Sequence, residues 1–410
     1  MKKIYYGKAV YDSKEIKAVN KVLKNESLSL VDGKNVKKLE KVVSKLFGKK
    51  YGLMVNSGSS ANLLGLSSFK FKKGSEIITP NLTFSTTIAP IYQLGLVPHF
   101  IGVERNKFLA DLSQIEKCIN KKTAAIMIPN LLGNIADWKK ISKIAKKYNL
   151  KIIEDSADTI GYKIKNENTG KLSDIVTNSF YASHIINGAG TGGIVCFNNF
   201  NLYQRAKLLR GWGRSSATFN ESENVNKRFN VKISGLDYDA KYIFSELGYN
   251  FLPSELSAAF ALEQIKKLSS NINIRNKNFL FLKNFFSTYK EFFDLPEQNP
   301  GVRTPWLAFP LVIKKNKFFN RKDMQIFFEK NNIQTRTIFT GNILRQPVME
   351  KKTYKKHIKC DREADNVMKN GILLGCHQGM NKNELKYICD TFKRFKNKMI
   401  NKKTHYIAKR

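Results

Sequence analysis

The sequence predicts an α/β protein, with a large domain built on a mainly parallel sheet flanked by helices and a smaller α+β domain after it. The first observation is that short apolar strands alternate with amphipathic helical stretches from about residue 35 to residue 200. This alternation is typical of a parallel sheet covered by helices on both faces. The second observation is the length of 410 residues, because a chain of this size can bury a large core and still form a second domain.

The predicted elements follow one another in a regular order. Strand candidates are the apolar runs 51–55, 76–79, 97–100, 124–128 and 151–154, and helical periods cover 36–47, 63–68 and 137–148. Pro253-Ser254-Glu255 opens a predicted helix that reaches about Lys277, because proline suits the first turn and glutamate favours the positive end of the helix dipole. We therefore expect a large domain over 1–265, a small domain over 266–395 and a frayed basic tail over 396–410.

Charge and cysteine content limit the classes of partner. The formal net charge of +38 is compatible with nucleic-acid binding, but the lysines are scattered through most segments, so we expect no nucleic-acid partner. Attraction for polyanionic small molecules such as nucleotide diphosphates is a milder consequence.

The five cysteines form no CxxC pair or metal-ligand spacing. No apolar run approaches the roughly 18 residues of a membrane span, and the first residues lack the apolar block of a signal peptide. We expect a cytoplasmic protein without a metal or a membrane partner.

Two segments have the composition of a site for a phosphorylated, ring-containing cofactor. The turn Asn56-Ser57-Gly58-Ser59-Ser60-Ala61-Asn62 follows a strand and precedes a helix, where backbone N–H groups and the helix dipole favour a phosphate. Glu154-Asp155 ends a predicted strand, and a carboxylate there can keep a pyridine nitrogen protonated. Simple helix and turn capping are the alternatives for both segments. Phe84 is suited either to stack on a planar ring or to lie in the core.

A gap in the lysine distribution is the most informative feature. Leu172 to Ala206 contain no lysine, and within them Asn178-Ser179-Phe180-Tyr181-Ala182-Ser183-His184 leads to the Gly-rich run 188–193. This segment resembles the active-site segment of the DegT-type sugar aminotransferases, vitamin B6 enzymes of fold type I whose lysine forms a Schiff base with the cofactor. His184 stands at the position of that lysine. An imidazole cannot form the Schiff base but can move protons near neutral pH, which indicates proton chemistry in place of transamination.

The resemblance extends from Gly7 to Asp390 and implies a set of site residues. It implies a seven-stranded sheet in the large domain and a homodimer with shared active sites, in which Asn250 reaches the cofactor phosphate of the neighbouring subunit. The cofactor contacts that it implies are Gly58, Ser59, Phe84, Asp155, Asp158, Ser179 and Asn250.

One branch of the family matches best, namely the nucleotide-sugar 3-dehydratases that carry a histidine after Ser-Phe-Tyr. Segments 211–214, 238–242, 304–306 and 336–347 resemble that branch. The resemblance implies substrate contacts for Arg214, Arg336 and Arg345. Arginines suit a fork-like grip on phosphate or carboxylate, although Arg336 and Arg345 would serve equally in structural ion pairs.

Two departures from the branch affect the expected chemistry. Its CDP-sugar members bind a [2Fe-2S] cluster through four cysteines, whereas here Ser156 follows Asp155 and residues 215–229 contain no cysteine. Without these thiolates we expect no Fe-S cluster, as in GDP-4-keto-6-deoxymannose 3-dehydratase. The second departure is the run Ala189-Gly190-Thr191-Gly192-Gly193, which replaces a shorter Gly-Glu-Gly-Gly and leaves the geometry beyond His184 open.

The resemblance thus implies a pyridoxal or pyridoxamine phosphate enzyme in which L-glutamate is the amino donor. His184 would be the base that assists loss of the C3 hydroxyl from a nucleotide-linked 4-keto-6-deoxyhexose. The product would be a 3,6-dideoxy-4-keto sugar for surface polysaccharide. The alternatives are a 4-amino-sugar aminotransferase with its lysine elsewhere, a noncatalytic sugar-nucleotide-binding relative and a nucleic-acid binder.

Overall fold

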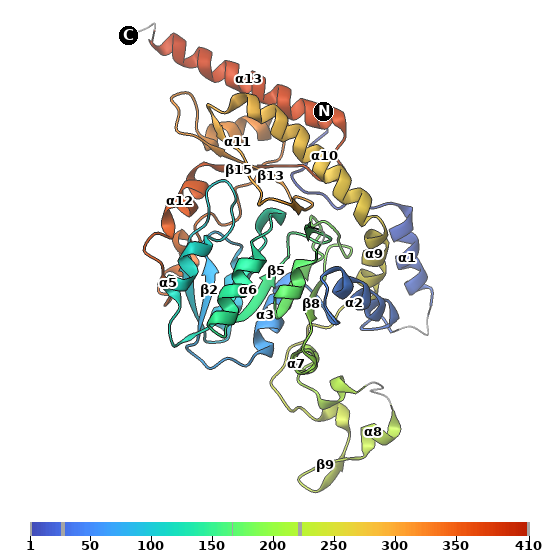
Figure 1. Ribbon diagram of the computed structural model, residues 1–410. Helices are drawn as coiled ribbons and strands as arrows, with labels where there is room; N and C mark the ends of the chain where they lie inside the picture. The colour runs from blue at the N-terminus through green and yellow to red at the C-terminus, as the bar shows by residue number, and fades with distance from the viewer. Residues whose placement is uncertain (1, 26–28, 166, 220–223, 408–410) are drawn as a thin grey trace.

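An eight-stranded sheet forms the centre of the protein in this computed structural model, which describes residues 2–25, 29–165, 167–219 and 224–407 (Figure 1). The strand order is β1-β8-β7-β5-β4-β2-β3-β14, and only β8 runs antiparallel to its neighbours. The strands are β1 (Tyr51–Val55), β2 (Glu76–Pro80), β3 (Val97–Ile101), β4 (Thr123–Pro129), β5 (Lys151–Asp155), β7 (Ile175–Ser179), β8 (Gly193–Phe197) and β14 (Lys355–Lys356). The predicted strands are therefore present, with boundaries shifted by at most one residue.

The sheet has one strand more than the seven that we expected. The additional strand, β14, pairs in parallel with His99 and Phe100 of β3. It is only two lysines long, so no apolar run marks it in the sequence. Lys355 contacts the buried Glu76 carboxylate at 2.6 Å, and this ion pair helps hold the short strand at the sheet edge.

Helices cover both faces of the sheet, and the alternation of side chains along each strand explains why. In β4, Ile126 and Ile128 pack in the core beneath α2 (Lys34–Leu46), α5 (Ile115–Cys118) and α6 (Trp138–Lys147). Ala125 and Met127, on the opposite face, pack with α3 (Gly58–Ser68) and α4 (Ser85–Gln93). Three more helices join this layered body. α7 (Phe200–Arg210) packs on α3, α9 (Glu255–Lys266) packs on α2, and α1 (Ser13–Leu23) packs on α9.

The predicted long helix from residue 255 to 277 is two helices. α9 (Glu255–Lys266) ends one residue before Lys267, and α10 (Leu268–Phe286) begins one residue after it. Lys267 is held at this junction by Asp12 and Glu15. The break thus lies at a residue held by a tertiary contact, which periodicity alone does not reveal.

A second unit lies beyond α10 and contains a three-stranded antiparallel sheet in the order β11-β13-β15. Its elements are β11 (Phe293–Asp294), β13 (Phe309–Ile313), α11 (Arg321–Lys330), α12 (Asp361–Asn370), β15 (Gly371–Leu374) and α13 (Lys382–Ile407). The N-terminal arm, residues 2–12, joins this second unit through a bridge between Ile4 and Ile333. The expected frayed tail is wrong for residues 396–407, because α13 continues to Ile407; extension of a helix already formed needs no new nucleation. β12 (Val302–Arg303) pairs with β6 (Lys163–Ile164).

One segment extends away from the rest of the molecule beyond α7 (Figure 1). It carries α8 (Val225–Phe229) and the hairpin of β9 (Val231–Ile233) and β10 (Leu236–Tyr238). Large apolar side chains are exposed along it, namely Val225, Phe229, Ile233, Leu236, Tyr238, Tyr242, Phe244 and Leu247. We call residues 212–219 and 224–248 the projecting segment.

Candidate functional site

A cavity of about 550 Å³ lies at the carboxyl ends of the sheet strands. This is the edge at which open α/β sheets bind ligands. Loops that follow β1, β2, β4, β5 and β7 supply most of its wall. The predicted residues that line it are Gly58, Ser59, Phe84, Asp155, Asp158, Ser179 and His184.

The first turn of α3 opens onto this cavity. Ser57 caps the helix by accepting a hydrogen bond from Ser60 N at 3.0 Å. The N–H groups at the start of a helix have no intrahelical acceptor and attract anions. A Cβ on Gly58 would lie 2.5 Å from Ser179 Cβ, so only glycine allows the turn to approach the end of β7 this closely. The geometry suits a phosphate beside Gly58, Ser59 and Ser179.

Asp155 provides an oriented carboxylate at the end of β5. Its Oδ2 accepts hydrogen bonds from Asn62 Nδ2 at 2.8 Å and from Thr87 Oγ1 at 2.9 Å, and its Oδ1 accepts one from Ala157 N at 3.1 Å. Burial raises the pKa of Asp155, while these hydrogen bonds oppose the rise. A cationic ring nitrogen placed against this carboxylate would counter the cost of burying its charge.

Glu154 lies on the other face of the strand, as the alternation of strand side chains requires. Its carboxylate accepts hydrogen bonds from Asn130, Ser156 and Tyr162 in the core. Of the two adjacent acids in the sequence motif, Asp155 is therefore the one that faces the cavity.

Asp158 is a second buried acid in the cavity wall. Its Oδ2 accepts a hydrogen bond from Leu132 N at 2.8 Å. Burial raises the pKa of Asp158 to about 7, with a further contribution from the nearby Asp155 charge. Asp158 therefore titrates near neutral pH.

His184 is half-buried in the turn that follows β7. Its Nδ1 lies 3.3 Å from the carbonyl oxygen of Ser179. Because a carbonyl only accepts hydrogen bonds, Nδ1 carries the hydrogen and Nε2 keeps its lone pair. Burial lowers the pKa of His184 to about 4, and Arg275 adds to the effect. A neutral imidazole with a free Nε2 is the form of histidine that accepts protons.

The unusual Gly-rich run after His184 forms a closed turn at the cavity rim. Ala189, Gly190 and Gly192 adopt positive φ angles of 54°, 100° and 113°. Gly192 N donates to Asn56 O at 2.9 Å, and Phe180 N donates to Gly192 O at 2.9 Å. These bonds attach the turn to β1 and β7, so that Gly190, Thr191 and Gly192 line the cavity beside the start of α3.

Several lining residues were not predicted from the sequence. Asn62 and Thr87 hold Asp155, whereas Tyr6, Leu307 and Phe339 come from segments distant in the sequence. Asn62 is part of the predicted phosphate turn, so its position four residues after Gly58, one turn into α3, was a usable signal. No local pattern marks Tyr6, because contacts with distant residues place it, among them the Ile4–Ile333 bridge and the hydrogen bond that Tyr6 N donates to Gln334 Oε1 at 3.1 Å.

Four predicted residues do not line this cavity. Arg345 forms a two-bond ion pair with Asp365, at 3.1 and 2.8 Å. Arg336 is exposed and donates to Thr335 O. Arg214 lies over the Trp212 ring at 4.2 Å in the projecting segment, and Asn250 is exposed near the base of that segment, where it bridges to Gly211.

The residues lining the cavity include no lysine. Lys49, a buried lysine of the large unit, instead donates to the carbonyl oxygens of Ser173 and Asp174. Within the described residues there is no cluster of three or more His, Cys, Asp or Glu side chains suited to a metal, and no helix is long and apolar enough to cross a membrane. The five cysteines are buried and free.

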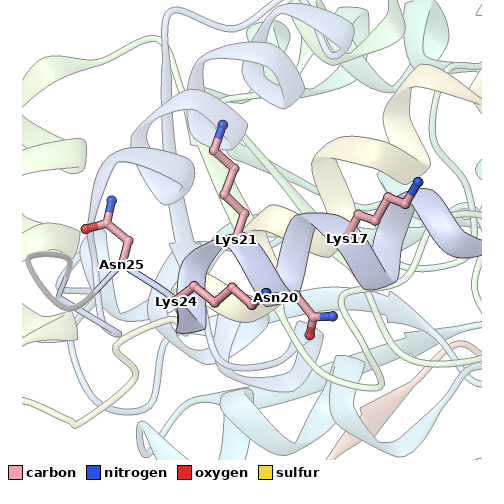
Figure 2. Close-up of a pocket in the computed structure, with 5 residues that line it drawn as sticks. All are labelled: Lys17, Asn20, Lys21, Lys24 and Asn25. Atoms are coloured by element: carbon pink, nitrogen blue, oxygen red, sulfur yellow. The ribbon is translucent and has the colours of Figure 1, made fainter.

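Volume alone does not identify the site. A larger, open hollow of about 710 Å³ is lined by Lys17, Asn20, Lys21, Lys24 and Asn25 (Figure 2). These side chains come from α1 and the two residues that follow it, and among the described residues no group from another element lines the hollow. The cavity beside His184 is smaller but brings together groups from many elements.

A pyridoxal-type cofactor fits the residues of the cavity beside His184. The α3 terminus is suited to the phosphate, Asp155 to the ring nitrogen and the half-exposed Phe84 to the ring face. Phe84 contacts Phe339 edge-on, with ring centroids 6.0 Å apart. The structure thus places an anion site, an acid and an aromatic ring around one cavity.

Comparison with known proteins agrees with this geometry. The model of the DegT/DnrJ/EryC1/StrS aminotransferase family matches residues 10–393. The lipopolysaccharide biosynthesis protein RfbH of Salmonella typhimurium is 33% identical over 367 residues, which cover 87% of this chain and 84% of RfbH. UDP-4-amino-4,6-dideoxy-N-acetyl-beta-L-altrosamine transaminase of Campylobacter jejuni serotype O:23/36 is 28% identical, covering 95% of this chain and 96% of that protein.

Solved structures of related enzymes match the fold of this chain. E. coli GDP-4-keto-6-deoxy-D-mannose-3-dehydratase with bound hydrated PLP superposes with a TM-score of 0.86 at 28% identity, covering 95% of this chain and 99% of that one. A GDP-4-keto-6-deoxymannose-3-dehydratase with a trapped PLP-glutamate geminal diamine superposes with a TM-score of 0.84, also at 28% identity, covering 94% and 99%. The aminotransferase-like fold is therefore shared over nearly the whole chain.

Proposed function

The chain belongs to the DegT/DnrJ/EryC1/StrS aminotransferase family, and on that premise we propose that it is a nucleotide-sugar 3-dehydratase. It is a PLP-dependent sugar-modifying enzyme, as its relatives are. The proposed reaction removes the C3 hydroxyl of a nucleotide-linked 4-keto-6-deoxyhexose. Its product would be a 3,6-dideoxy-4-keto sugar that serves as a precursor of surface polysaccharide. We propose that the reaction takes place in the cytoplasm.

The observation that carries the proposal is a histidine in a cavity wall that contains no lysine. An aminotransferase of this family uses a lysine amine both to hold the cofactor and to move protons. Here the imidazole of His184 is available only for the second task. Because a related protein is a transaminase, formation of a 4-amino sugar is the second candidate function. The absence of lysine from the residues that line the cavity argues against it.

Each residue of the site has a defined task in this proposal. The bound cofactor supplies a pyridine ring that accepts electron density. The N-terminus of α3, together with Ser59 and Ser179, would bind its phosphate, and Asp155 would keep the ring nitrogen protonated. His184 would accept and return a proton through Nε2, because Nδ1 is engaged by Ser179 O. General acid–base help of this kind contributes about 10² to 10⁴ in rate.

The amino donor in this proposal is L-glutamate, and the chemistry needs no Fe-S cluster. The glutamate adduct of a structural neighbour supports the donor. Ser156 and the cysteine-free segment 215–229 support cluster-free chemistry, because such clusters in proteins are held by cysteine thiolates.

We also propose a homodimer with shared active sites. The projecting segment exposes apolar side chains that a monomer would leave in water; Leu247 is 97% exposed and Leu236 70%. Exposed apolar patches of this kind mark interaction surfaces. Asn250 lies at the base of the segment, which is a suitable position for reaching the cofactor phosphate of a partner subunit.

The proposal is tested by incubating the purified protein with PLP, L-glutamate and CDP-, GDP- or dTDP-linked 4-keto-6-deoxyhexoses. Mass spectrometry should show that one of the sugars loses its C3 oxygen, while L-glutamate is oxidised to 2-oxoglutarate and its nitrogen is released as ammonia. Formation of a 4-amino sugar that keeps its C3 oxygen would identify an aminotransferase instead.

A further inference from the structure

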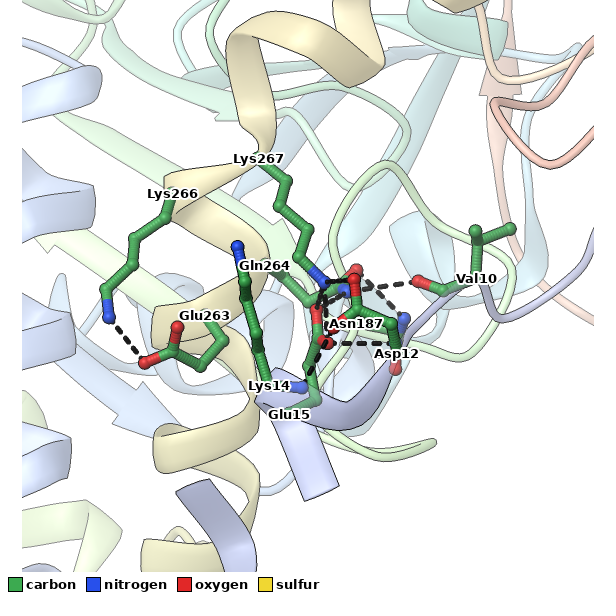
Figure 3. A network of polar contacts seen from close by, with 9 residues as sticks. All are labelled: Val10, Asp12, Lys14, Glu15, Asn187, Glu263, Gln264, Lys266 and Lys267. Carbon is green, nitrogen blue, oxygen red and sulfur yellow. Dashed lines mark hydrogen bonds and ion pairs between the residues drawn. The ribbon is translucent and has the colours of Figure 1, made fainter. Parts of the chain in front are cut away.

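A buried polar network connects the loop of His184 with the N-terminal arm (Figure 3). At its centre is Gln264 of α9, whose side chain is fully buried. Its Oε1 accepts a hydrogen bond from Asn187 Nδ2 at 3.2 Å. Its Nε2 donates to Val10 O at 3.0 Å and to Glu15 Oε1 at 2.6 Å. One side-chain amide thus joins the His184 loop (residues 180–192), the N-terminal arm and α1.

Glu15 and Lys267 set the orientation of this amide. Glu15 is 0% exposed, and both of its carboxylate oxygens lie 2.7 Å from Lys267 Nζ. A buried carboxylate is costly unless it is paired, so the ion pair keeps Glu15 charged and able only to accept hydrogen bonds. The Gln264 amide must therefore turn its nitrogen toward Glu15, which leaves its oxygen for Asn187.

The two segments that Gln264 connects also meet at the cavity. The arm contributes Tyr6 to the wall, and the loop contributes Ser183 and His184. A Cβ added to Gly7 would lie 2.9 Å from Ser183 Cβ, so the arm and the loop are packed directly against each other. Val10 and Asn187, the two attachment points, lie only a few residues from this contact.

We propose that Gln264 is a positioning residue, which clamps the N-terminal arm against the His184 loop and so fixes the imidazole in its proton-transfer position. The Glu15–Lys267 ion pair orients the side-chain amide of Gln264. The inference rests on the proposed function for its effect on catalysis. It makes the arm, far from His184 in the sequence, part of the machinery that places the base.

The test is Gln264→Leu, which removes the amide while keeping a similar size. The matched control is Lys266→Met, which deletes the neighbouring exposed pair with Glu263 at 2.5 Å (Figure 3). For Gln264→Leu we expect kcat for dehydration to fall by about 10-fold or more, because small misplacements of a catalytic group are costly. The KM for the sugar nucleotide should stay nearly constant, and Lys266→Met should match the parent protein.

Two readouts need no substrate and separate this inference from the proposed function. Amide hydrogen exchange in residues 7–12 and 183–192 should quicken in Gln264→Leu. The pKa of His184, followed by NMR of labelled histidine, should rise toward its ordinary value as the loop admits water. Unchanged exchange and an unchanged His184 titration would overturn the clamp whether or not the parent protein dehydrates sugars.

A second variant addresses the possibility that Gln264→Leu fails to fold. Asn187→Ala breaks only the bond from the loop to Gln264. It should speed exchange in residues 183–192 and leave residues 7–12 at the parent rate. The proposal would be contradicted if residues 183–192 exchanged no faster in Asn187→Ala than in the parent protein.

Discussion

Asn62 Nδ2 donates a hydrogen bond to Asp155 Oδ2 at 2.8 Å, and it does so from the helix whose first turn faces the same cavity. The phosphate end and the ring-nitrogen end of the proposed cofactor site are therefore fixed by one element, α3. Thr177 Oγ1 donates to the side-chain oxygen Oδ1 of Asn62 at 2.6 Å, which orients the side-chain amide. The distance between the anion site and the acid is consequently set by a rigid helix rather than by loops.

Thr87→Val tests the holding of Asp155. Thr87 Oγ1 donates to Asp155 Oδ2 at 2.9 Å, and valine keeps the shape while removing this donor. Loss of a hydrogen bond to a charged group should weaken pyridoxal phosphate binding by about 10-fold. Fluorescence titration measures the Kd, with Thr288→Val on the surface as the control. An unchanged Kd would show that Asp155 does not depend on Thr87 for its charge.

How far the sequence predicts this site depends on whether a signal is local. The strand-turn-helix pattern at 51–68 is local, and the helix indeed begins where glycine allows close approach to Ser179. The family resemblance favours Asp155 over Glu154, but the local pattern cannot distinguish them, because the choice depends on which side of the strand meets the cavity. Tyr6 and Gln264 have no local pattern, because their places follow from contacts between distant segments.

The cofactor should be held without a covalent bond. Borohydride treatment of the PLP-loaded protein, followed by denaturation and filtration, should leave the cofactor in the filtrate. His184→Lys is the internal control, because it returns an amine to the family position and should retain the label. Recovery of a pyridoxyllysine peptide from the unmodified protein would contradict the expectation.

His184→Asn should separate proton transfer from binding. The amide has a similar polar volume but does not titrate in this range, so C3 dehydration should fall by at least about 10². Binding of pyridoxal phosphate should weaken less than catalysis does. Single-turnover mass spectrometry at saturating sugar nucleotide measures the effect. Normal dehydration by this variant would remove His184 from the mechanism.

Asp158 should make the stability of the cofactor-free protein depend on pH. Burial raises the pKa of Asp158 to about 7 from an ordinary value of 3.8, so between about pH 4 and pH 7 the folded state binds more protons than the unfolded state. The contribution of Asp158 to the free energy of unfolding should therefore decrease as pH rises through this window and level off above it.

Asp158→Asn should remove this contribution without loss of the local contact, since its amide oxygen still accepts the bond from Leu132 N. The variant should be more stable than the parent at pH 8 by up to about 4 kcal/mol, and similar at pH 4. Urea unfolding at several pH values measures this, with the exposed Asp237→Asn as the control. A parallel pH profile for parent and variant would show that Asp158 ionises normally.

Subunit complementation tests whether the active sites are shared. His184→Asn disables the base in its own subunit, and Asn250→Ala should disable the phosphate contact that the subunit gives to its partner. Each variant alone should be nearly inactive. Mixed dimers should contain one site with both residues intact and one with neither, so refolding an equal mixture should restore about one quarter of the parent activity. If the mixture stays as inactive as its components, Asn250 serves its own subunit or no site at all, and the shared site is wrong.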